Sequence, residues 1–184
     1  MKRTRDGMPR VDFLGTGNAF SPPGRMHALA LIDESILIDT PPTRLAQLRR
    51  SGFSGSAIKH ILFTHWHGYH IFGFPFLMLD RKYISDREGK ASLDVYLRPG
   101  GIDILESLCR SGFPGSLESM DHIIDWHESE NDEIGDTGWK FYRFPVLHNP
   151  DTDPHGYELV HETGFRLLHL SLIHISEPTR RVES

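Results

Sequence analysis

The sequence predicts an α/β or α+β domain built around a substantial β-sheet. Short apolar runs recur along the chain and stop at glycine, proline or charged residues, which is typical of strands. Stretches with helical spacing lie between these runs, so strands and helices are interspersed. The chain has 184 residues, of which 38% are hydrophobic, and this is enough for one domain with a core of its own.

The first third of the chain predicts a strand, a hairpin and a helix. Val11–Gly17 predicts a strand that runs into a glycine turn, and His27–Asp33 and Ser35–Thr40 predict the paired strands of one hairpin. Two prolines follow and end the second of these strands, because proline has no N–H to donate. Thr43–Gly52 has leucines at helical spacing and a glycine where the helix would be capped.

The rest of the chain predicts more strands, with helices between them. Ile58–His65 has an uninterrupted apolar centre, which is typical of a strand buried on both faces. The following stretch, GFPFLMLDRKYI, predicts a helix or an apolar loop, and the acidic residues 130–138 predict a turn. Further strands are predicted over Ser92–Gly101, His122–Glu128 and Trp139–His148, a helix over Gly101–Gly112, and a hairpin over His155–Leu170.

Charge and cysteine content exclude several classes of protein. The net charge of −5 and the isoelectric point of about 6.2 exclude a strongly basic nucleic-acid binder. Cys109 is the single cysteine, so no intrachain disulfide or cysteine-rich zinc module is expected, and its apolar helical surroundings predict a buried core thiol. No run approaches the roughly 18 apolar residues of a membrane span. The basic N-terminus lacks the apolar stretch of a secretory signal, so we expect a cytoplasmic protein without a membrane partner.

Three histidines follow the predicted buried strand within six residues. His65, His67 and His70 lie in the stretch FTHWHGYHIFGFP. A His-x-His pair brings two imidazoles close together, and a third histidine can close the cluster from the other side. Loops at the carboxyl ends of strands collect ligands in layered α/β proteins. Imidazole nitrogen is a preferred zinc ligand, so zinc is the expected metal.

Four segments, LGTG, LIDTPP, THWHGYHIFGFPFL and FPVLH, together resemble the metallo-β-lactamase fold superfamily. Within it the chain resembles the ribonuclease Z-like hydrolases, from about Val11 to His169. The specific part is the His-x-His-x-x-His motif with FGFP behind it. LGTG alone is weak, and it is not a dinucleotide fingerprint because Phe20 takes the place of the third glycine. The resemblance implies an αββα sandwich over residues 1–169 that is incomplete in its second half.

The resemblance also implies roles for single residues. His65 and His67 match the histidines of the family's first metal, and His148, which follows a predicted strand, matches the third histidine of that metal. His70 matches the histidine of the second metal. Asp39 matches an acidic position that supports the motif loop and does not bind metal. Carboxylates in such positions orient ligating imidazoles.

Two departures from the family pattern affect the second metal. Tyr69 stands where the family has an aspartate that binds this metal, and a phenol with a reference pKa of about 10 is a poor substitute for a carboxylate. The family's bridging aspartate, which follows a strand like FRLLHLS, and its final histidine have no counterpart here. We therefore expect one zinc ion or none in this chain, against two in the full-length family, and no catalytic residue is assigned.

The last residues, 170–184, predict a segment that is not native to the domain. The sequence LSLIHISEPTR, from Leu170 to Arg180, resembles the translation of a transposase-type adapter used for sequencing libraries. The alternative is an ordinary polar C-terminus. On the adapter interpretation, His174 is not counted as a ligand.

Two functions from different classes agree with these patterns. The first is a metal-dependent hydrolase resembling ribonuclease Z-like phosphodiesterases, in which a zinc-activated hydroxide acts on a phosphodiester, with activity impaired in this chain. The substrate would be RNA or a small molecule, and the acidic balance favours a small molecule. Members of the family are often homodimers. The second is a degenerate, non-catalytic metal-binding or interaction protein of the same fold, which Tyr69 favours.

The remaining histidines and two aspartates carry no motif and are interpreted as structural. Turn or surface positions are expected for His155, His161 and His169, a solvated turn for Asp151 and Asp153, and structural positions for His27, His60, His122 and His127.

Overall fold

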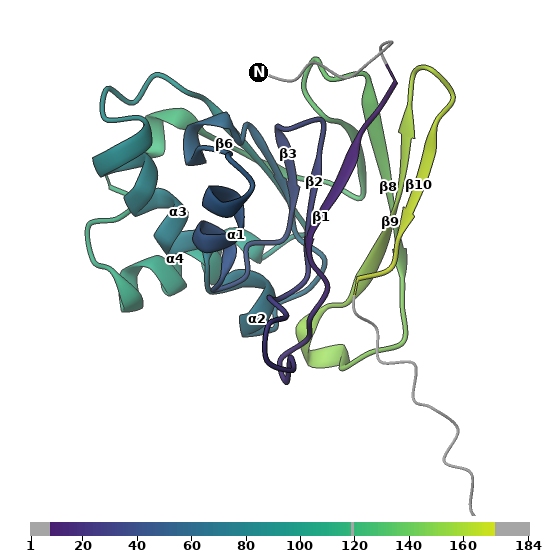
Figure 1. Ribbon diagram of the computed structural model, residues 1–184, viewed down its shortest axis with the longest axis horizontal. Coiled ribbons are helices and arrows are strands. Elements are labelled where there is room, and N and C mark those ends of the chain that lie inside the picture. The colour runs from purple at the N-terminus through teal and green to yellow at the C-terminus, as the bar shows by residue number, and fades with distance from the viewer. Residues whose placement is uncertain (1–7, 119, 172–184) are drawn as a thin grey trace, which may run out of the picture.

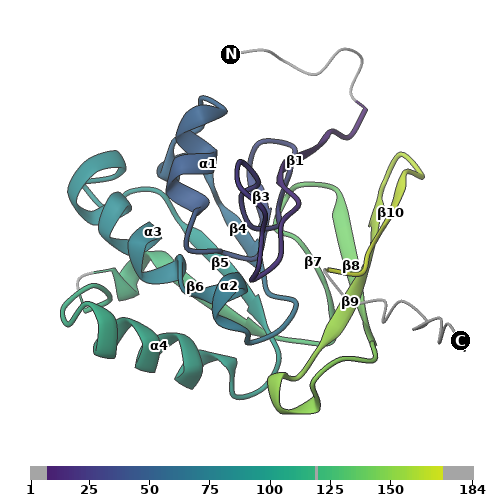
Figure 2. The same cartoon turned by 60° about the horizontal axis from the view of Figure 1, so that its bottom comes forward.

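Two stacked sheets and one layer of helices make up the computed structural model, which describes residues 8–118 and 120–171. Figure 1 shows the helices on one face of the first sheet and the second sheet against its other face. Within the described residues no α-helix follows the first sheet in the chain, and none covers the outer face of the second sheet (Figure 2). The described part of the sandwich is therefore αββ, a partial form of the predicted αββα arrangement.

The first sheet has six strands in the order β1-β2-β3-β4-β5-β6. The first three are antiparallel neighbours, whereas β3 to β6 run parallel, so the carboxyl ends of these four strands meet at one edge. The predicted hairpin is confirmed as β2 and β3. The strands are β1 (Val11–Gly15), β2 (Leu29–Ile32), β3 (Ile36–Ile38), β4 (His60–Leu62), β5 (Leu93–Leu97) and β6 (Ile124–Glu128).

The second sheet has four antiparallel strands in the order β10-β9-β8-β7. The predicted hairpin of β9 and β10 is confirmed, but the acidic stretch is only partly a turn. Its residues Asn131–Glu133 form β7, because they pair with β8 and Glu133 forms an ion pair with Lys140 across the ladder. The strands are β7 (Asn131–Glu133), β8 (Trp139–Pro145), β9 (His155–His161) and β10 (Arg166–His169).

The helices confirm the predicted positions with two refinements. The apolar stretch after the motif is helix α3 (Phe74–Asp80), which continues into a π-helical turn over Arg81–Ser85. The motif itself contains the one-turn helix α2 (Gly68–Ile71), which the sequence pattern did not indicate. The other α-helices are α1 (Arg44–Arg50) and α4 (Gly101–Gly112), and 3₁₀ turns span Gly55–Ala57, Asp121–Ile123 and Pro150–Thr152.

Two hydrophobic cores lie on the two faces of the first sheet. Along β2, Leu29 and Leu31 pack into the core under the helices, whereas Ala30 and Ile32 pack into the core between the sheets. The side chains of a strand alternate between faces, so a strand covered on both faces must be apolar throughout. This is why the central strands of the first sheet have continuous apolar sequences.

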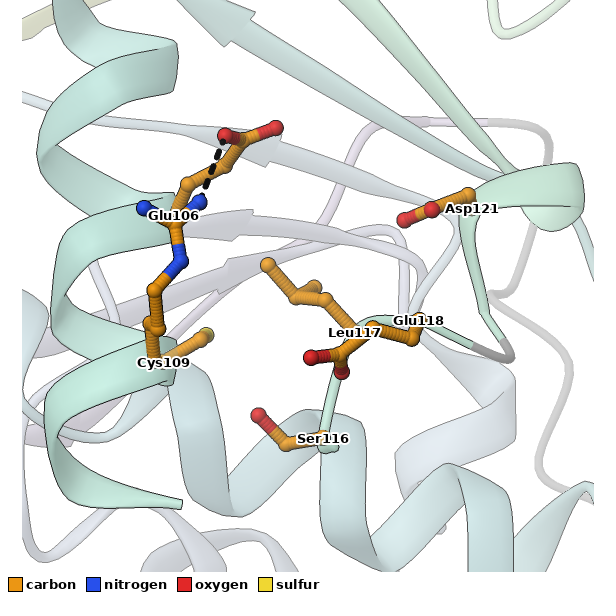
Figure 3. A pocket seen from close by; sticks show the side chains of 7 residues that line it. Glu106, Cys109, Ser116, Leu117, Glu118 and Asp121 are labelled. Atoms are coloured by element: carbon orange, nitrogen blue, oxygen red, sulfur yellow. Dashed lines mark ion pairs between the residues drawn. The ribbon is translucent and has the colours of Figure 1, made fainter. Parts of the chain in front are cut away.

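Cys109 confirms the predicted core thiol. It is 1% exposed in α4, and burial raises the pKa of its thiol to about 11. It lines a cavity of about 100 Å³ together with Ser116, Glu106, Glu118 and Asp121. Figure 3 shows these side chains. A thiol with a raised pKa carries little thiolate near neutral pH, so it is a poor nucleophile.

Candidate metal centre

The motif loop, residues 63–67, follows β4 at the edge where the parallel strands end. His65 is 3% exposed, while His67 is half-buried and stands at the N-terminus of α2. His148 reaches the same point from the segment between β8 and the 3₁₀ turn Pro150–Thr152. The loop is fixed to that segment by a hydrogen bond of 3.0 Å from the Trp66 N–H to the Thr152 carbonyl. Residues 81 positions apart in the chain are thereby brought together.

Three of the four predicted ligands form one cluster. The Nε2 atom of His65 and the Nε2 atom of His148 each lie 3.1 Å from the Nδ1 atom of His67. One ligand atom from each of the three residues lies within 4.8 Å of the others. Of the histidine, cysteine, aspartate and glutamate side chains in the described residues, these three histidines form the group whose spacing could hold a metal ion.

This donor set fits a zinc ion. Zinc binds imidazole nitrogen at about 2.0–2.1 Å, so nitrogens at two corners of a tetrahedron are separated by about 3.3–3.4 Å. The two separations of 3.1 Å are close to that value. A cluster of three imidazoles also leaves the fourth tetrahedral position to water or substrate, as catalytic zinc sites require.

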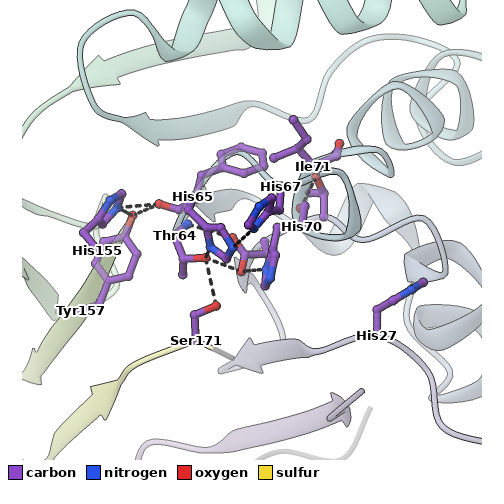
Figure 4. A network of polar contacts seen from close by, with 12 residues as sticks. His27, Thr64, His65, His67, His70, Ile71, His155, Tyr157 and Ser171 are labelled. Carbon is purple, nitrogen blue, oxygen red and sulfur yellow. Dashed lines mark hydrogen bonds and ion pairs between the residues drawn. The ribbon is translucent and has the colours of Figure 1, made fainter. Parts of the chain in front are cut away.

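Asp39 connects the loop to the first sheet. Its Oδ1 atom accepts a hydrogen bond of 2.8 Å from the Thr64 N–H, and its Oδ2 atom accepts one of 2.8 Å from the Thr64 hydroxyl. The Thr64 Oγ1 atom lies 3.0 Å from His65 Nδ1 (Figure 4). A ring that donates from Nδ1 keeps the lone pair of Nε2 directed at the cluster. Asp39 also has a positive φ of 67°, which is unusual for a residue other than glycine.

His70 lies beneath the cluster and is not one of the three converging ligands. Its ring is fully buried, and its Nδ1 atom is 2.6 Å from Oδ2 of Asp39. Its Nε2 atom is buried with no hydrogen-bond partner in the structure. A buried polar atom of this kind carries a free-energy cost unless a ligand or water satisfies it. The unsatisfied Nε2 atom is compatible with a metal ligand, but His70 is not in the converging group, so its assignment to a second metal stays a prediction.

Tyr69 occupies the space beside these rings. Its ring centroid is 4.3 Å from that of His70, and it stacks on His67 at 5.4 Å with an interplanar angle of 19°. Burial, and then the charge of Asp39, raise the pKa of the Tyr69 phenol. The phenol consequently stays neutral near pH 7 and offers no anionic oxygen to a metal.

Burial controls the charge of the central groups. It lowers the pKa of His65 to about 3, with His70 adding to the effect, so His65 is a neutral ligand near pH 7. Burial alone would raise the pKa of the Asp39 carboxyl, but His70 and the hydrogen bonds to Asp39 outweigh it and leave the pKa below its usual value. A neutral imidazole beside an ionised carboxylate is the combination that binds a metal cation.

A family model described as "Anti-Pycsar protein Apyc1" matches residues 9–167. The chain belongs to this family. Curated relatives of this Apyc1 family member place it in the ribonuclease Z-like group. Ribonuclease Z of Methanothermobacter thermautotrophicus is 31% identical over 124 residues, which cover 66% of this chain and 38% of the relative. Ribonuclease Z of Bradyrhizobium diazoefficiens is 30% identical over 150 residues, covering 80% and 48%. The chain thus spans less than half the length of these two relatives.

Solved structures show that the family member has the metallo-β-lactamase fold. YhfI of Bacillus subtilis, a metallo-β-lactamase fold protein, aligns with a TM-score of 0.69 at 13% identity, over 89% of this chain and 63% of that one. Human tRNase Z, short form, aligns with a TM-score of 0.64 at 22% identity, over 89% and 69%. Zinc-bound PqqB from Methylobacterium extorquens gives a TM-score of 0.64 at 17% identity, over 88% and 64%. The predicted fold class is confirmed as a partial metallo-β-lactamase fold.

His155 corrects one expectation for the Apyc1 family member. Predicted as a turn or surface residue, it is 2% exposed in β9, and its Nε2 atom lies 2.8 Å from the Phe63 carbonyl. The prediction was wrong because the residue opens a strand that faces the first sheet. His169 is half-buried in β10, where burial lowers the pKa of its imidazole. The buried position of His155 could have been found only from the alternation of side chains along β9.

The adapter-like segment of the Apyc1 family member is described only at its first two residues. These are Leu170 and Ser171, and the Ser171 hydroxyl lies 3.2 Å from the Thr64 hydroxyl. The rest of the segment, including His174, lies outside the described residues. Asp151 is exposed, whereas Asp153 pairs with Arg98. Over the ranges that the structure describes, every helix is too short or too polar to cross a lipid bilayer.

Proposed function

We propose that this chain is the metal-binding part of a zinc-dependent phosphodiester hydrolase. The convergence of His65, His67 and His148 on one point carries this proposal. Support comes from the curated ribonuclease Z relatives and from structural neighbours that include a zinc-bound protein. The proposal combines a donor set that fits zinc with a family of hydrolases.

The residues around the cluster would prepare it for this chemistry. A bound zinc ion acts as a Lewis acid and lowers the pKa of a coordinated water. Thr64 accepts the Nδ1 proton of His65 and so keeps the Nε2 lone pair directed at the cluster. Asp39 holds Thr64 through two hydrogen bonds and thereby fixes the backbone that carries His65. Burial lowers the pKa of His65 to about 3, so its imidazole stays neutral near pH 7 and keeps a lone pair for a metal ion.

Tyr69 limits the centre to one metal ion in our proposal. The phenol stacks against His67 and His70 in place of a carboxylate, and without that anion a second cation has only the imidazole of His70. Phosphodiester hydrolysis by metal pairs depends on charge stabilisation at both the attacking and leaving oxygens. We therefore expect reduced turnover in this chain. A non-catalytic metal-binding protein of the same fold is the second candidate, and the position of Tyr69 favours it.

The substrate class within phosphodiesters is RNA or a small molecule. The ribonuclease Z relatives support RNA, whereas the family description names an anti-Pycsar protein and not a ribonuclease. The net charge of −5 favours a small phosphodiester, because a polyanion needs a broad basic surface. Cytoplasmic location and homodimer formation are parts of the same proposal.

Zinc stoichiometry and turnover test this proposal together. The chain should bind one zinc ion per molecule and hydrolyse bis(p-nitrophenyl) phosphate slowly, with both properties lost in His65→Ala and retained in His122→Ala, which changes an exposed histidine. Zinc binding without any turnover would select the non-catalytic candidate. Absence of zinc binding in the wild type would overturn the proposal. An RNA with a 3′ extension and a cyclic nucleotide, compared as substrates, would separate the two substrate classes.

A further inference from the structure

Behind the motif loop lies a layer of polar side chains from the second sheet. The Phe63 carbonyl stands just beyond the last residue of β4, and it accepts a hydrogen bond of 2.6 Å from the Tyr157 hydroxyl. The Nε2 atom of His155 is 2.8 Å from the same oxygen. Figure 4 shows the side chains of His155 and Tyr157 pointing towards the motif loop, with dashed lines for these contacts. None of these groups belongs to the three-histidine cluster.

Backbone contacts continue the same attachment along the loop. The His155 N–H donates to the Thr64 carbonyl at 3.1 Å, and the Trp66 N–H donates to the Thr152 carbonyl at 3.0 Å. From the opposite side, Asp39 accepts from the Thr64 N–H. The loop that carries His65 is therefore held between a carboxylate of the first sheet and a strand of the second.

The polar character of this layer is not needed for packing alone. Tyr157 is 0% exposed, and a third residue, Arg143, stacks on its ring at 5.1 Å. The Nη1 atom of Arg143 also lies 2.9 Å from His155 Nε2, a nitrogen that either donates to the Phe63 carbonyl or accepts from the guanidinium, depending on the tautomer. The Nε and Nη2 atoms of Arg143 are buried without hydrogen-bond partners in the structure. Apolar residues of similar volume would fill such a layer without this cost. The arrangement is explained if the Phe63 carbonyl has to be held in one orientation.

We propose that Tyr157 is a positioning residue that orients the metal ligands through the Phe63 carbonyl, and that His155 assists it in the tautomer that donates from Nε2. Rotation of the 63–64 peptide group would move the Thr64 N–H away from Asp39 and displace the imidazole of His65. Fixing the carbonyl prevents that rotation. The inference rests on the proposed function in one respect, namely that the cluster so positioned holds a metal ion.

The test compares Tyr157→Phe with Trp139→Phe. Trp139 is also buried between the sheets and also loses one hydrogen bond, the 2.7 Å bond from its Nε1 to Asp33, but it lies at the other end of the strands. Both variants should unfold at a lower temperature. Zinc affinity, measured by competition with a chelator, should fall about tenfold or more in Tyr157→Phe. It should stay at the wild-type value in Trp139→Phe. Equal affinities for Tyr157→Phe and wild type would overturn the proposal.

A second measurement does not depend on metal. In the presence of chelator, amide hydrogen exchange at Thr64 and Trp66 should be faster in Tyr157→Phe and unchanged in Trp139→Phe. His155→Leu should reproduce the fast exchange, whereas His155→Gln, which keeps a side-chain amide near Phe63, should restore protection. If the wild type bound no zinc, the proposed function would fail while the exchange rates still decided the positioning role. Unchanged exchange in Tyr157→Phe would refute it.

Discussion

At the scale of single residues, Tyr69 is the side chain that we propose limits the number of metal ions at the site. Its ring fills the space beside His70 and presents a neutral phenol to the histidine cluster. A carboxylate at this position would be anionic near pH 7, because the reference pKa of an aspartate is about 3.9. The charge of this residue, more than its size, is therefore expected to decide whether a second cation binds.

We predict that Tyr69→Asp increases the zinc bound from one ion per chain towards two. The new carboxylate would add an anionic ligand beside the buried Nε2 atom of His70, which has no hydrogen-bond partner in the structure. Metal analysis after gel filtration measures the stoichiometry, and Tyr69→Phe is the matched control because it removes the hydroxyl without adding charge. A ratio that stays at one in Tyr69→Asp would show that other ligands limit the second site.

At His155 we predict a pH-dependent loss of stability. Burial, and then the neighbouring Arg143, lower the pKa of His155 to about 4 from its usual 6.5. The unfolded chain therefore takes up a proton between about pH 6.5 and 4 that the folded chain excludes. The free energy of unfolding should fall across this window by roughly 3 kcal/mol from His155 alone.

Urea unfolding of the metal-free chain at pH 7, 5.5 and 4.5 measures this loss. His155→Gln removes the titrating group while keeping a polar side chain beside Phe63, Arg143 and Tyr157. Its unfolding free energy should depend less steeply on pH than that of the wild type. Identical slopes would mean that other buried histidines, such as His65, account for the whole effect.

At the scale of elements, the position of α2 and α3 depends on a close backbone approach at Gly73. The Gly73 N–H donates a hydrogen bond of 2.7 Å to the carbonyl of Thr40, the residue that follows Asp39. A Cβ atom at Gly73 would lie 2.1 Å from the carbonyl oxygen of Pro41. Any side chain here must push the helices away from the end of β3, and with them His70.

Gly73→Ala should therefore destabilise the fold by about 1–3 kcal/mol, the range for overpacking a close contact. Gly112→Ala is the control, because a Cβ at the end of α4 meets no atom within 4 Å apart from its own helix and chain neighbours, and alanine favours helix there. Denaturant unfolding measures both. An unchanged midpoint in Gly73→Ala would mean that the helices shift freely relative to β3.

At the scale of the whole molecule, the three-histidine cluster joins the motif loop to the segment between β8 and β9, which also contact each other through backbone hydrogen bonds. His65 and His67 follow the first sheet, whereas His148 belongs to the chain that leads into β9. A ligand that binds only the folded state stabilises it by mass action, which amounts to about 2.7 kcal/mol at a hundred times the dissociation constant. Zinc should therefore stabilise both sheets together.

We predict that a chelator lowers the thermal midpoint of the zinc-loaded chain by about 5–10 °C, given about 2–4 °C for each kcal/mol in a chain of this size. His148→Ala should show no shift with zinc or chelator, because it removes the ligand that links the two sheets. Differential scanning fluorimetry measures the midpoints. A full zinc-dependent shift in His148→Ala would place the ion at another site.

The sequence by itself determined most of the strands and helices, the core thiol and the residues of the motif, but it did not indicate β7 or α2. These follow from local patterns: alternation and apolar runs identify strands, and the spacing of His65 and His67 identifies a ligand pair. The family resemblance indicated His148 as the third ligand, but only the tertiary structure decided that it lies beside His65 and His67 while His70 lies beneath them, and that His155 is buried against Phe63. The physical reason is that these contacts cross between two sheets, and neither periodicity nor spacing along one strand records what the facing strand presents.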